Sequence, residues 1–186
     1  STGELVWERR LSGYDRGLRV MDGSLVVVDY IGDSYDYGLI FLDPQTGAEQ
    51  RTLTPACIYD EYTTITLNPD SPFLYEAGNN TLTFISDSYY GCIQPLDLAS
   101  GELLWQYIPQ DSFSFSPYGT QALDTETSIY FSTSNQLLAA DKATGNVQTL
   151  LANEDYEFLP LAVSGDTLIV RARRTRGTEK FELWGL

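Results

Sequence analysis

The stretch GLIFLDPQTGAEQRTL, residues 38–53, decides the fold, because it places a sharp turn between two β-rich runs. The turn is DPQTG, from Asp43 to Gly47. An aspartate in the first position accepts backbone N–H groups two residues on, and the glycine adopts the positive φ that a tight hairpin needs. The stretch therefore predicts two antiparallel strands joined by a short turn.

The same turn returns twice along the chain. It reads DLASG from Asp97 to Gly101 and DKATG from Asp141 to Gly145, so the three glycines lie 54 and 44 residues apart. Thr2 and Gly3 match the end of a fourth copy. Repetition at this period is typical of solenoids, propellers and arrays.

Each repeat contains four short β-rich runs bounded by Gly, Pro, Asn, Asp or Ser. In the second repeat, for example, we expect the first strand at TTITL, residues 63–67, and the last at ELLWQY, residues 102–107. No segment keeps an apolar stripe of helical period over three turns, so almost no helix is expected. An all-β propeller of four-stranded antiparallel blades fits this pattern, because such twisted sheets bury both faces against neighbouring blades.

The repeat boundaries define four blades and one additional strand. The blades are expected at residues 17–54, 62–108, 119–152 and 158–186, and the outer strand of the last blade at residues 3–10. That N-terminal strand would complete the last blade either within the chain or across chains. Two arrangements follow: four blades that close on themselves, or a segment of a larger seven- or eight-bladed protein, of which two copies pair into a ring through open blade edges.

Composition excludes several classes of function. The 186 residues include 26 acidic and 11 basic ones, for a net charge of −15, which opposes binding to nucleic acid or to an anionic membrane surface. No apolar run is long enough for direct insertion into a membrane. The chain has no histidine, so Ser-His-Asp and Cys-His nucleophile systems and HExxH zinc sites are excluded.

The turns belong to a longer pattern, Ala-x-Asp-x-x-Thr-Gly-x-x-x-Trp, which resembles the blade signature of the quinoprotein-like β-propeller family (PQQ-like repeat, BamB-like). Ala139, Asp141, Thr144 and Gly145 match it, as do Gly101 with Trp105 and Thr2-Gly3 with Trp7, whereas Arg51 and Thr149 replace the tryptophan in the other two repeats. The resemblance implies a propeller in an exported protein, with Trp7 and Trp105 packed between blades. The residues of this structural motif are Trp7, Asp43, Gly47, Asp97, Gly101, Trp105, Asp141 and Gly145.

The resemblance does not extend to catalysis. Quinone-dependent members of the family resemble one another in a vicinal cysteine pair, but Cys57 and Cys92 are not adjacent, and no Cys-x-x-Cys-His haem motif is present. We therefore expect neither an enzyme nor a bound cofactor. Calcium is the metal that suits so acidic a chain, although no Asp-x-Asp-x-Asp-Gly loop is present. Cys57 and Cys92 form either a disulfide or two buried thiols.

The loops between the second and third strands differ most between repeats and are the candidate interaction sites. Three readings stay open for them: solvated loops, charge contacts between blades or chains, and a ligand-binding patch. The candidate residues are Asp33, Tyr35, Asp36, Tyr37, Asp87, Tyr89 and Tyr90 in the first two repeats, and Arg173, Arg174 and Arg176 in the last.

These observations favour a non-catalytic propeller scaffold for protein–protein interaction or assembly. An extracytoplasmic location (periplasm, cell surface or secreted) follows from the resemblance, and a disulfide would agree with it. The alternatives are a propeller that binds a small ligand or carbohydrate, and a degenerate quinoprotein dehydrogenase. Fold alone does not choose among them.

Overall fold

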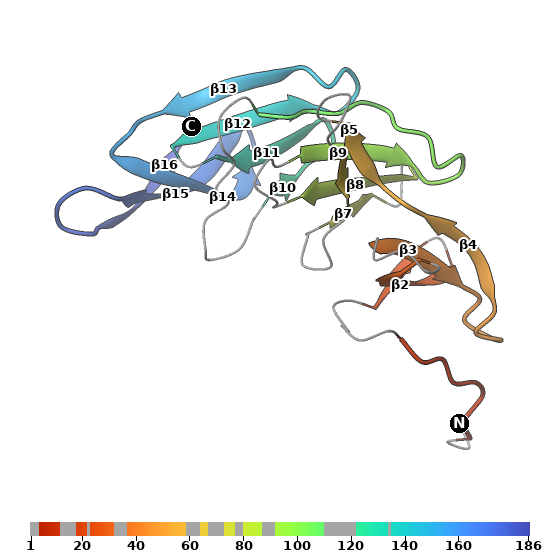
Figure 1. Ribbon diagram of the computed structural model, residues 1–186. Helices are drawn as coiled ribbons and strands as arrows, with labels where there is room; N and C mark the ends of the chain where they lie inside the picture. The colour runs from red at the N-terminus through yellow and green to blue at the C-terminus, as the bar shows by residue number, and fades with distance from the viewer. Residues whose placement is uncertain are drawn as a thin grey trace. The chain divides into compact units, whose positions relative to one another are not determined.

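The computed structural model of the chain is an arrangement of antiparallel sheets (Figure 1). It describes residues 4–11, 18–21, 23–31, 37–58, 64–66, 73–76, 80–86, 92–109, 122–133 and 135–186. Within these ranges there is no helix, and hence none long and apolar enough to cross a bilayer. The prediction of an all-β chain is therefore confirmed for the part of the chain that the structure describes.

The chain divides into two compact units, and the N-terminal unit comprises residues up to 86 with residues 93–104. It contains a four-stranded meander (β1–β4), a two-stranded hairpin (β5–β6) and a three-stranded sheet (β7–β9). The bounds are β1 Arg19–Met21, β2 Ser24–Tyr30, β3 Tyr37–Leu42, β4 Glu49–Leu53, β5 Ala56–Ile58, β6 Thr64–Thr66, β7 Phe73–Glu76, β8 Thr81–Ser86 and β9 Cys92–Asp97.

The C-terminal unit includes residues 105–186 and consists of two further sheets. One is a four-stranded meander (β10–β13), and the other is three-stranded (β14–β16). The bounds are β10 Leu123–Asp124, β11 Ser128–Ser132, β12 Gln136–Asp141, β13 Val147–Ala152, β14 Tyr156–Ser164, β15 Thr167–Arg174 and β16 Phe181–Gly185.

The central strands of the first sheet are buried on both faces. Val26 and Val28 of β2 face a core shared with Leu82 and Phe84 of β8, whereas Val27 faces the opposite side. That opposite side is covered by the N-terminal segment, and its core consists of Val27, Ile40 and Leu42 packed against Trp7, Leu11 and Leu25. Successive side chains of a strand point to opposite faces, so the apolar run SLVVV can supply both cores.

The two sheets of the C-terminal unit share one core. Leu137 of β12 packs with Phe158, Leu168, Val170 and Ala172 of the β14–β16 sheet. Trp184 of β16 covers this core from the edge, where its ring contacts those of Tyr156 and Phe158. One face of the β14–β16 sheet is therefore buried against the β10–β13 sheet.

The second repeat departs from the sequence prediction. Residues 63–67 were expected to open it, but Thr64–Thr66 (β6) pairs with Ala56–Ile58 (β5), and Phe73–Glu76 (β7) is the strand that pairs with β8. The β5–β6 hairpin is an insertion, and it accounts for the spacing of 54 instead of 44 residues between successive turn glycines. β-branched residues predict a strand, but they do not predict which strand it pairs with.

The expected outer strands of the second and fourth repeats also differ. Residues 102–107 form no continuous strand: Leu103 bridges to Leu96, Leu104 N donates to Pro95 O (3.0 Å) and Asp97 N donates to Glu102 O (2.9 Å), but Pro95 has no N–H to continue the ladder. Within the described ranges, the β14–β16 sheet ends at β16 and residues 4–11 form no strand. The expected fourth strand of the last sheet is thus not seen.

The three Asp-to-Gly turns are closed by the same set of hydrogen bonds. Asp43 Oδ1 accepts the N–H groups of Gln45 and Thr46, each at 2.8 Å, and Gly47 N donates to Asp43 O at 2.8 Å. Asp97 with Ser100 and Asp141 with Thr144 repeat this pattern. Gly47, Gly101 and Gly145 have φ values of +69°, +74° and +74°, the conformation for which a turn selects glycine.

A side chain from another part of the same unit binds each turn, and we call this contact the turn latch. The indole N–H of Trp7 donates to Pro44 O (3.0 Å), and that of Trp105 donates to Lys142 O (2.9 Å). The guanidinium of Arg51 donates in the same way to Leu98 O. In all three latches the acceptor is the residue that directly follows the turn aspartate.

In the first repeat, where Arg51 replaces the tryptophan, two other side chains make the latch contacts. Arg51 of β4 supplies the hydrogen bond, while its guanidinium carbon lies 4.3 Å from the centroid of the Phe41 ring. Leu53 of the same strand supplies the apolar contact, since its Cδ2 would lie 2.8 Å from a Cβ on Gly101. Two residues of β4 thus divide the role that one tryptophan fills elsewhere.

Replacing the latched glycines should cost more than replacing an open one. In Gly145→Ala the new Cβ would lie 2.8 Å from the Trp105 ring, whereas at Gly23, which also has positive φ, nothing lies within 4 Å. We expect Gly23→Ala to lose about 1–2 kcal/mol from backbone strain alone. Gly145→Ala should lose roughly 1–3 kcal/mol more through overpacking. Denaturant unfolding of both variants measures the difference, and equal losses would contradict the latch.

The turn aspartates should make stability depend on pH. Backbone N–H groups of Thr46 and Ser100 lower the pKa of Asp43 and of Asp97, and the Thr144 hydroxyl lowers the pKa of Asp141. These carboxylates therefore stabilise the folded state above about pH 4, and the stabilisation is lost as the pH falls through the lowered values.

Unfolding midpoints measured across this acid range test the pH dependence. A variant with asparagine at all three positions keeps acceptor oxygens but no longer titrates, so its stability should fall less steeply below about pH 4 than that of the unmodified chain. Identical slopes for the two proteins would show that other carboxylates control the acid transition.

Candidate functional site

The C-terminal unit contains an open groove of about 780 Å³. It lies where the turn between β10 and β11 meets the turn between β14 and β15. Tyr130, Leu150 and Leu168 supply apolar lining from the edge of the core, and Glu126, Gln148 and Asp166 supply polar lining. Its volume is within the range of pockets that bind drug-sized ligands.

Both turns that border the groove are held by local hydrogen bonds or by a glycine. Thr125 Oγ1 donates to Ser128 O (2.8 Å) and accepts from Ser128 N (3.1 Å), which closes the β10–β11 turn. In the β14–β15 hairpin, Ser164 pairs with Thr167, and Gly165 adopts a φ of +59°. Short loops of this kind, held by a sheet scaffold, give a binding site a defined shape.

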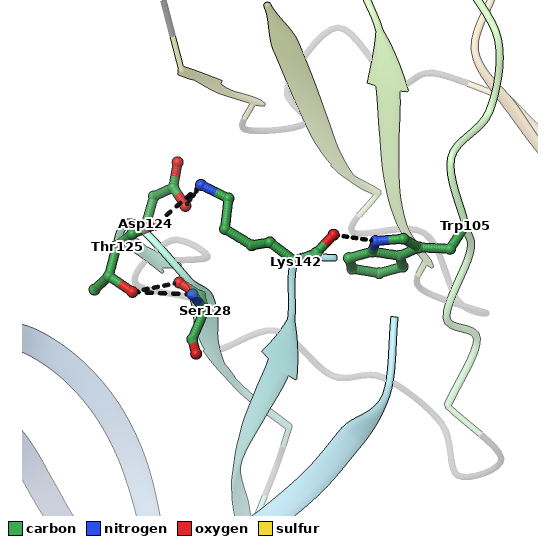
Figure 2. Close-up of polar contacts among 5 residues, drawn as sticks. All are labelled: Trp105, Asp124, Thr125, Ser128 and Lys142. Atoms are coloured by element: carbon green, nitrogen blue, oxygen red, sulfur yellow. Dashed lines mark hydrogen bonds and ion pairs between the residues drawn. The ribbon is translucent and has the colours of Figure 1, made fainter. Parts of the chain in front are cut away.

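Lys142 ties the groove turn to the Asp141–Gly145 turn (Figure 2). Its ammonium lies 2.9 Å from Asp124 Oδ1 and donates to Thr125 O at 2.9 Å, and its backbone N–H donates to Thr127 O at 2.9 Å. Figure 2 shows its side chain directed at Asp124, while its carbonyl receives the Trp105 indole. Lys142 therefore connects the latch to the β10–β11 turn that borders the groove.

Sequence reasoning missed Asp124, Lys142 and the groove. One signal was available: the position after the turn aspartate is Pro44 or Leu98 in two repeats but the charged Lys142 in the third. A lysine there indicates a carboxylate partner nearby, because buried ammonium groups are paired. Its partner could not be read from the sequence, since Asp124 lies 18 residues away.

Most of the predicted interaction loops of the first two repeats lie outside the described residues. Asp33, Tyr35, Asp36, Asp87, Tyr89 and Tyr90 are in that group. Tyr37 is described, and it begins β3. Its hydroxyl donates to the Tyr30 hydroxyl at 2.8 Å, and the two rings stack with centroids 4.3 Å apart. The described tyrosine is thus part of a cross-strand pair within its own sheet.

Two of the three arginines of the last repeat, Arg173 and Arg176, have acidic partners in their own sheet and its turns. Arg173 lies 2.9 Å from Glu157 and 3.6 Å from Glu179, and Arg176 lies 3.6 Å from both Glu154 and Asp155. Arg174 ends β15, where its backbone N–H donates to Lys180 O. The exposed pair of Arg176 with Glu154 contributes about 0–1 kcal/mol.

Both cysteines of the chain are disulfide-bonded, which joins Cys57 to Cys92. Gln94 of β9 lies beside Cys57, since its amide donates to Ala56 O at 2.8 Å. Among the described residues, no group of three or more acidic, histidine or cysteine side chains is placed so that it could hold a metal ion.

Three of the antiparallel sheets carry an Asp-x-x-[Ser/Thr]-Gly turn held by a latch, and a repeated unit of this kind is typical of PQQ-like repeat proteins. The sequence matches the family described as outer membrane protein assembly factor BamB over residues 1–178. Because the match covers nearly the whole chain, the protein belongs to this family, which confirms the resemblance seen in the sequence. No curated protein matches the chain.

Removing the Lys142 charge should destabilise the C-terminal unit. Its side chain is 12% exposed and that of Asp124 is 23% exposed, so Lys142→Met would leave a largely buried carboxylate without its cation. We expect a loss of about 1–3 kcal/mol, less than for a fully buried pair because water reaches Asp124.

A second substitution and a control separate charge from packing. Lys142→Met combined with Asp124→Asn should recover most of the loss, because no uncompensated charge remains. Lys180→Met changes the same charge at an exposed position and should leave the denaturant midpoint unchanged. The ion pair has no role in stability if Lys142→Met unfolds at the midpoint of the unmodified chain.

Proposed function

We propose that this chain is a non-catalytic β-propeller domain that binds a protein partner and acts as an interaction scaffold. In this proposal four of its sheets are blades of a propeller, namely β1–β4, β7–β9, β10–β13 and β14–β16, and the β5–β6 hairpin is not a blade. Family membership supports the propeller geometry, and the description of the family supports a role in assembly. The groove of the C-terminal unit is the observation that carries the binding function.

The chemistry of the groove suits a short peptide segment. Tyr130, Leu150 and Leu168 offer an apolar surface, and Glu126 and Asp166 place carboxylates beside it. An apolar or aromatic side chain flanked by lysine or arginine would complement both features. The net charge of −15 would also accelerate the approach of a basic segment.

The proposed location is outside the cytoplasm. A disulfide between Cys57 and Cys92 persists in oxidising compartments and is rare in the cytosol. The description of the matched family refers to the outer membrane. Both observations support the periplasm, the cell surface or secretion as the setting in which the scaffold works.

Peptides selected from a random library against the intact chain test the groove. We expect the selected sequences to combine an aromatic or apolar residue with flanking lysine or arginine. The double variant Glu126→Lys with Asp166→Lys should weaken their binding about tenfold or more in calorimetry, because both groove carboxylates are reversed.

Glu102→Lys provides a control, since it reverses one carboxylate, as each groove substitution does, at an exposed site of the other unit. Its affinity for the selected peptides should stay near that of the unmodified chain. Peptides that bind equally well to the groove double variant would show that the groove is not the binding site.

The absence of catalysis and of a resident cofactor is also part of the proposal. Addition of pyrroloquinoline quinone with calcium should leave no bound chromophore after desalting and should give no dye reduction. A retained chromophore together with dye reduction would replace the scaffold proposal with a quinoprotein dehydrogenase.

A further inference from the structure

Two sheets of the chain can be compared position by position, because β1–β4 and β10–β13 are both four-stranded meanders with an Asp-to-Gly turn between their last two strands. Phe41 of β3 and Ala139 of β12 each stand two residues before the turn aspartate. Phe41 pairs with Val26 on the preceding strand, and Ala139 pairs with Tyr130. Phe41 and Ala139 therefore occupy the same position in their own sheets.

In the β1–β4 sheet, an aromatic ring fills this position. Phe41 is 1% exposed and lies in the core formed with Leu82 and Phe84 of β8. Arg51 pairs with it from β4, and the guanidinium carbon of Arg51 lies 4.3 Å from the centroid of the Phe41 ring. The position is thus closed by a phenylalanine with an arginine over its ring.

In the β10–β13 sheet the same position is left open. Leu137, two residues before Ala139, is fully buried in the core shared with the β14–β16 sheet, as Leu39 is in the core that contains Phe41. Ala139 points to the same face as Leu137, because successive side chains of a strand alternate, but it lines the groove. The core therefore ends at Leu137, and the groove begins at Ala139.

A second position follows the same pattern. Met21 and Ser24 flank the turn between β1 and β2, and Thr125 and Ser128 flank the corresponding turn between β10 and β11. Met21 is 1% exposed in the core with Phe41, whereas Thr125 lines the groove. Two large apolar side chains of the β1–β4 sheet thus correspond to a threonine and an alanine in the β10–β13 sheet, and the groove lies where their bulk is missing.

The walls beside Ala139 suit an aromatic ring. Tyr130 and Gln148 pair with Ala139 on its two sides, and both line the groove with side chains longer than that of alanine. Leu150 and Leu168 supply apolar lining from β13 and β15. A ring seated over Ala139 would meet the Tyr130 ring in an offset or edge-to-face contact, which favours an aromatic side chain over an aliphatic one.

Two exposed carboxylates lie beside this position. Glu126 and Asp166 belong to the two turns that border the groove. A guanidinium suits them better than an ammonium does, because its planar set of donors binds carboxylates in a bidentate manner and its flat face also stacks on aromatic rings. An arginine next to the seated ring would therefore complement both the carboxylates and the ring.

We propose that the partner segment is anchored by one phenylalanine or tyrosine side chain over Ala139, with a neighbouring arginine that covers the ring and pairs with Glu126 or Asp166. The two side chains of the partner would take the places that Phe41 and Arg51 hold in the β1–β4 sheet. This inference rests on the proposed function, and it narrows the partner from any apolar residue with basic neighbours to an aromatic–arginine pair.

The peptides selected from the random library serve as probes of the anchor. We expect them to share an aromatic residue with an arginine close by. Replacing the aromatic residue of a selected peptide by leucine should weaken its binding about tenfold in calorimetry, and replacing the arginine by lysine should also weaken it, although the charge is kept.

The outcomes separate this inference from the proposed function. Peptides that bind equally well with leucine and with lysine, but lose affinity for the Glu126→Lys, Asp166→Lys double variant, would overturn the aromatic–arginine anchor and leave the groove as the binding site. Peptides that bind that double variant as well as the unmodified chain would refute the proposed function itself.

Filling the position from within the chain gives a second test. Ala139→Phe should weaken the binding of the selected peptides at least about tenfold, because its own ring would occupy the place of the anchor. Ala139→Val adds less bulk and is the variant to use if the larger ring prevents folding; it should cause a smaller loss. The denaturant midpoint shows whether each variant is folded.

Ala152→Phe is the matched control, because it makes the same substitution at an exposed alanine of β13 outside the groove lining. Its affinity for the selected peptides should equal that of the unmodified chain. Unchanged affinity in folded Ala139→Phe, or in Ala139→Val where Ala139→Phe does not fold, would overturn the inference.

Discussion

The turn latch is the contact on which the repeats depend. A turn of five residues, closed by an aspartate and a serine or threonine, presents one carbonyl outward, directly after the aspartate. At two of the turns a tryptophan from a segment distant in sequence, Trp7 or Trp105, donates to that carbonyl and covers the turn glycine. Because the glycine has no Cβ, an indole ring can approach the backbone, and each latch ties a segment distant in sequence to the turn.

The latch also shows how far the motif tolerates change. Arg51 and Leu53 together replace one tryptophan, the first as the donor and the second as the apolar cover. At the third turn, the carbonyl of Lys142 accepts the hydrogen bond of the latch. Its ammonium also pairs with Asp124 and donates to the β10–β11 turn, a contact that Pro44 and Leu98 cannot make. The groove is thus attached to the most regular feature of the repeat.

Strands and turns could be predicted from the sequence, but which strands pair with each other could be predicted only in part. The two strands on either side of Asp43–Gly47 and the three turns lie where the sequence predicts them, because the hydrogen bonds that close such a turn act over a few residues. The assignment of residues 63–67 was wrong because a short β-rich run pairs equally well with a preceding or a following strand. Pro95 likewise limited the ladder beside residues 102–107.

The sequence by itself determined the all-β class, the family and the turn positions, since each depends on spacing and on the conformational preferences of Asp, Ser, Thr and Gly. The tertiary structure decided which carbonyl each latch binds, that Lys142 pairs with Asp124, and where the groove opens. These depend on residues brought together from distant parts of the chain. Such contacts follow from the packing of whole sheets, which no local pattern of residues specifies.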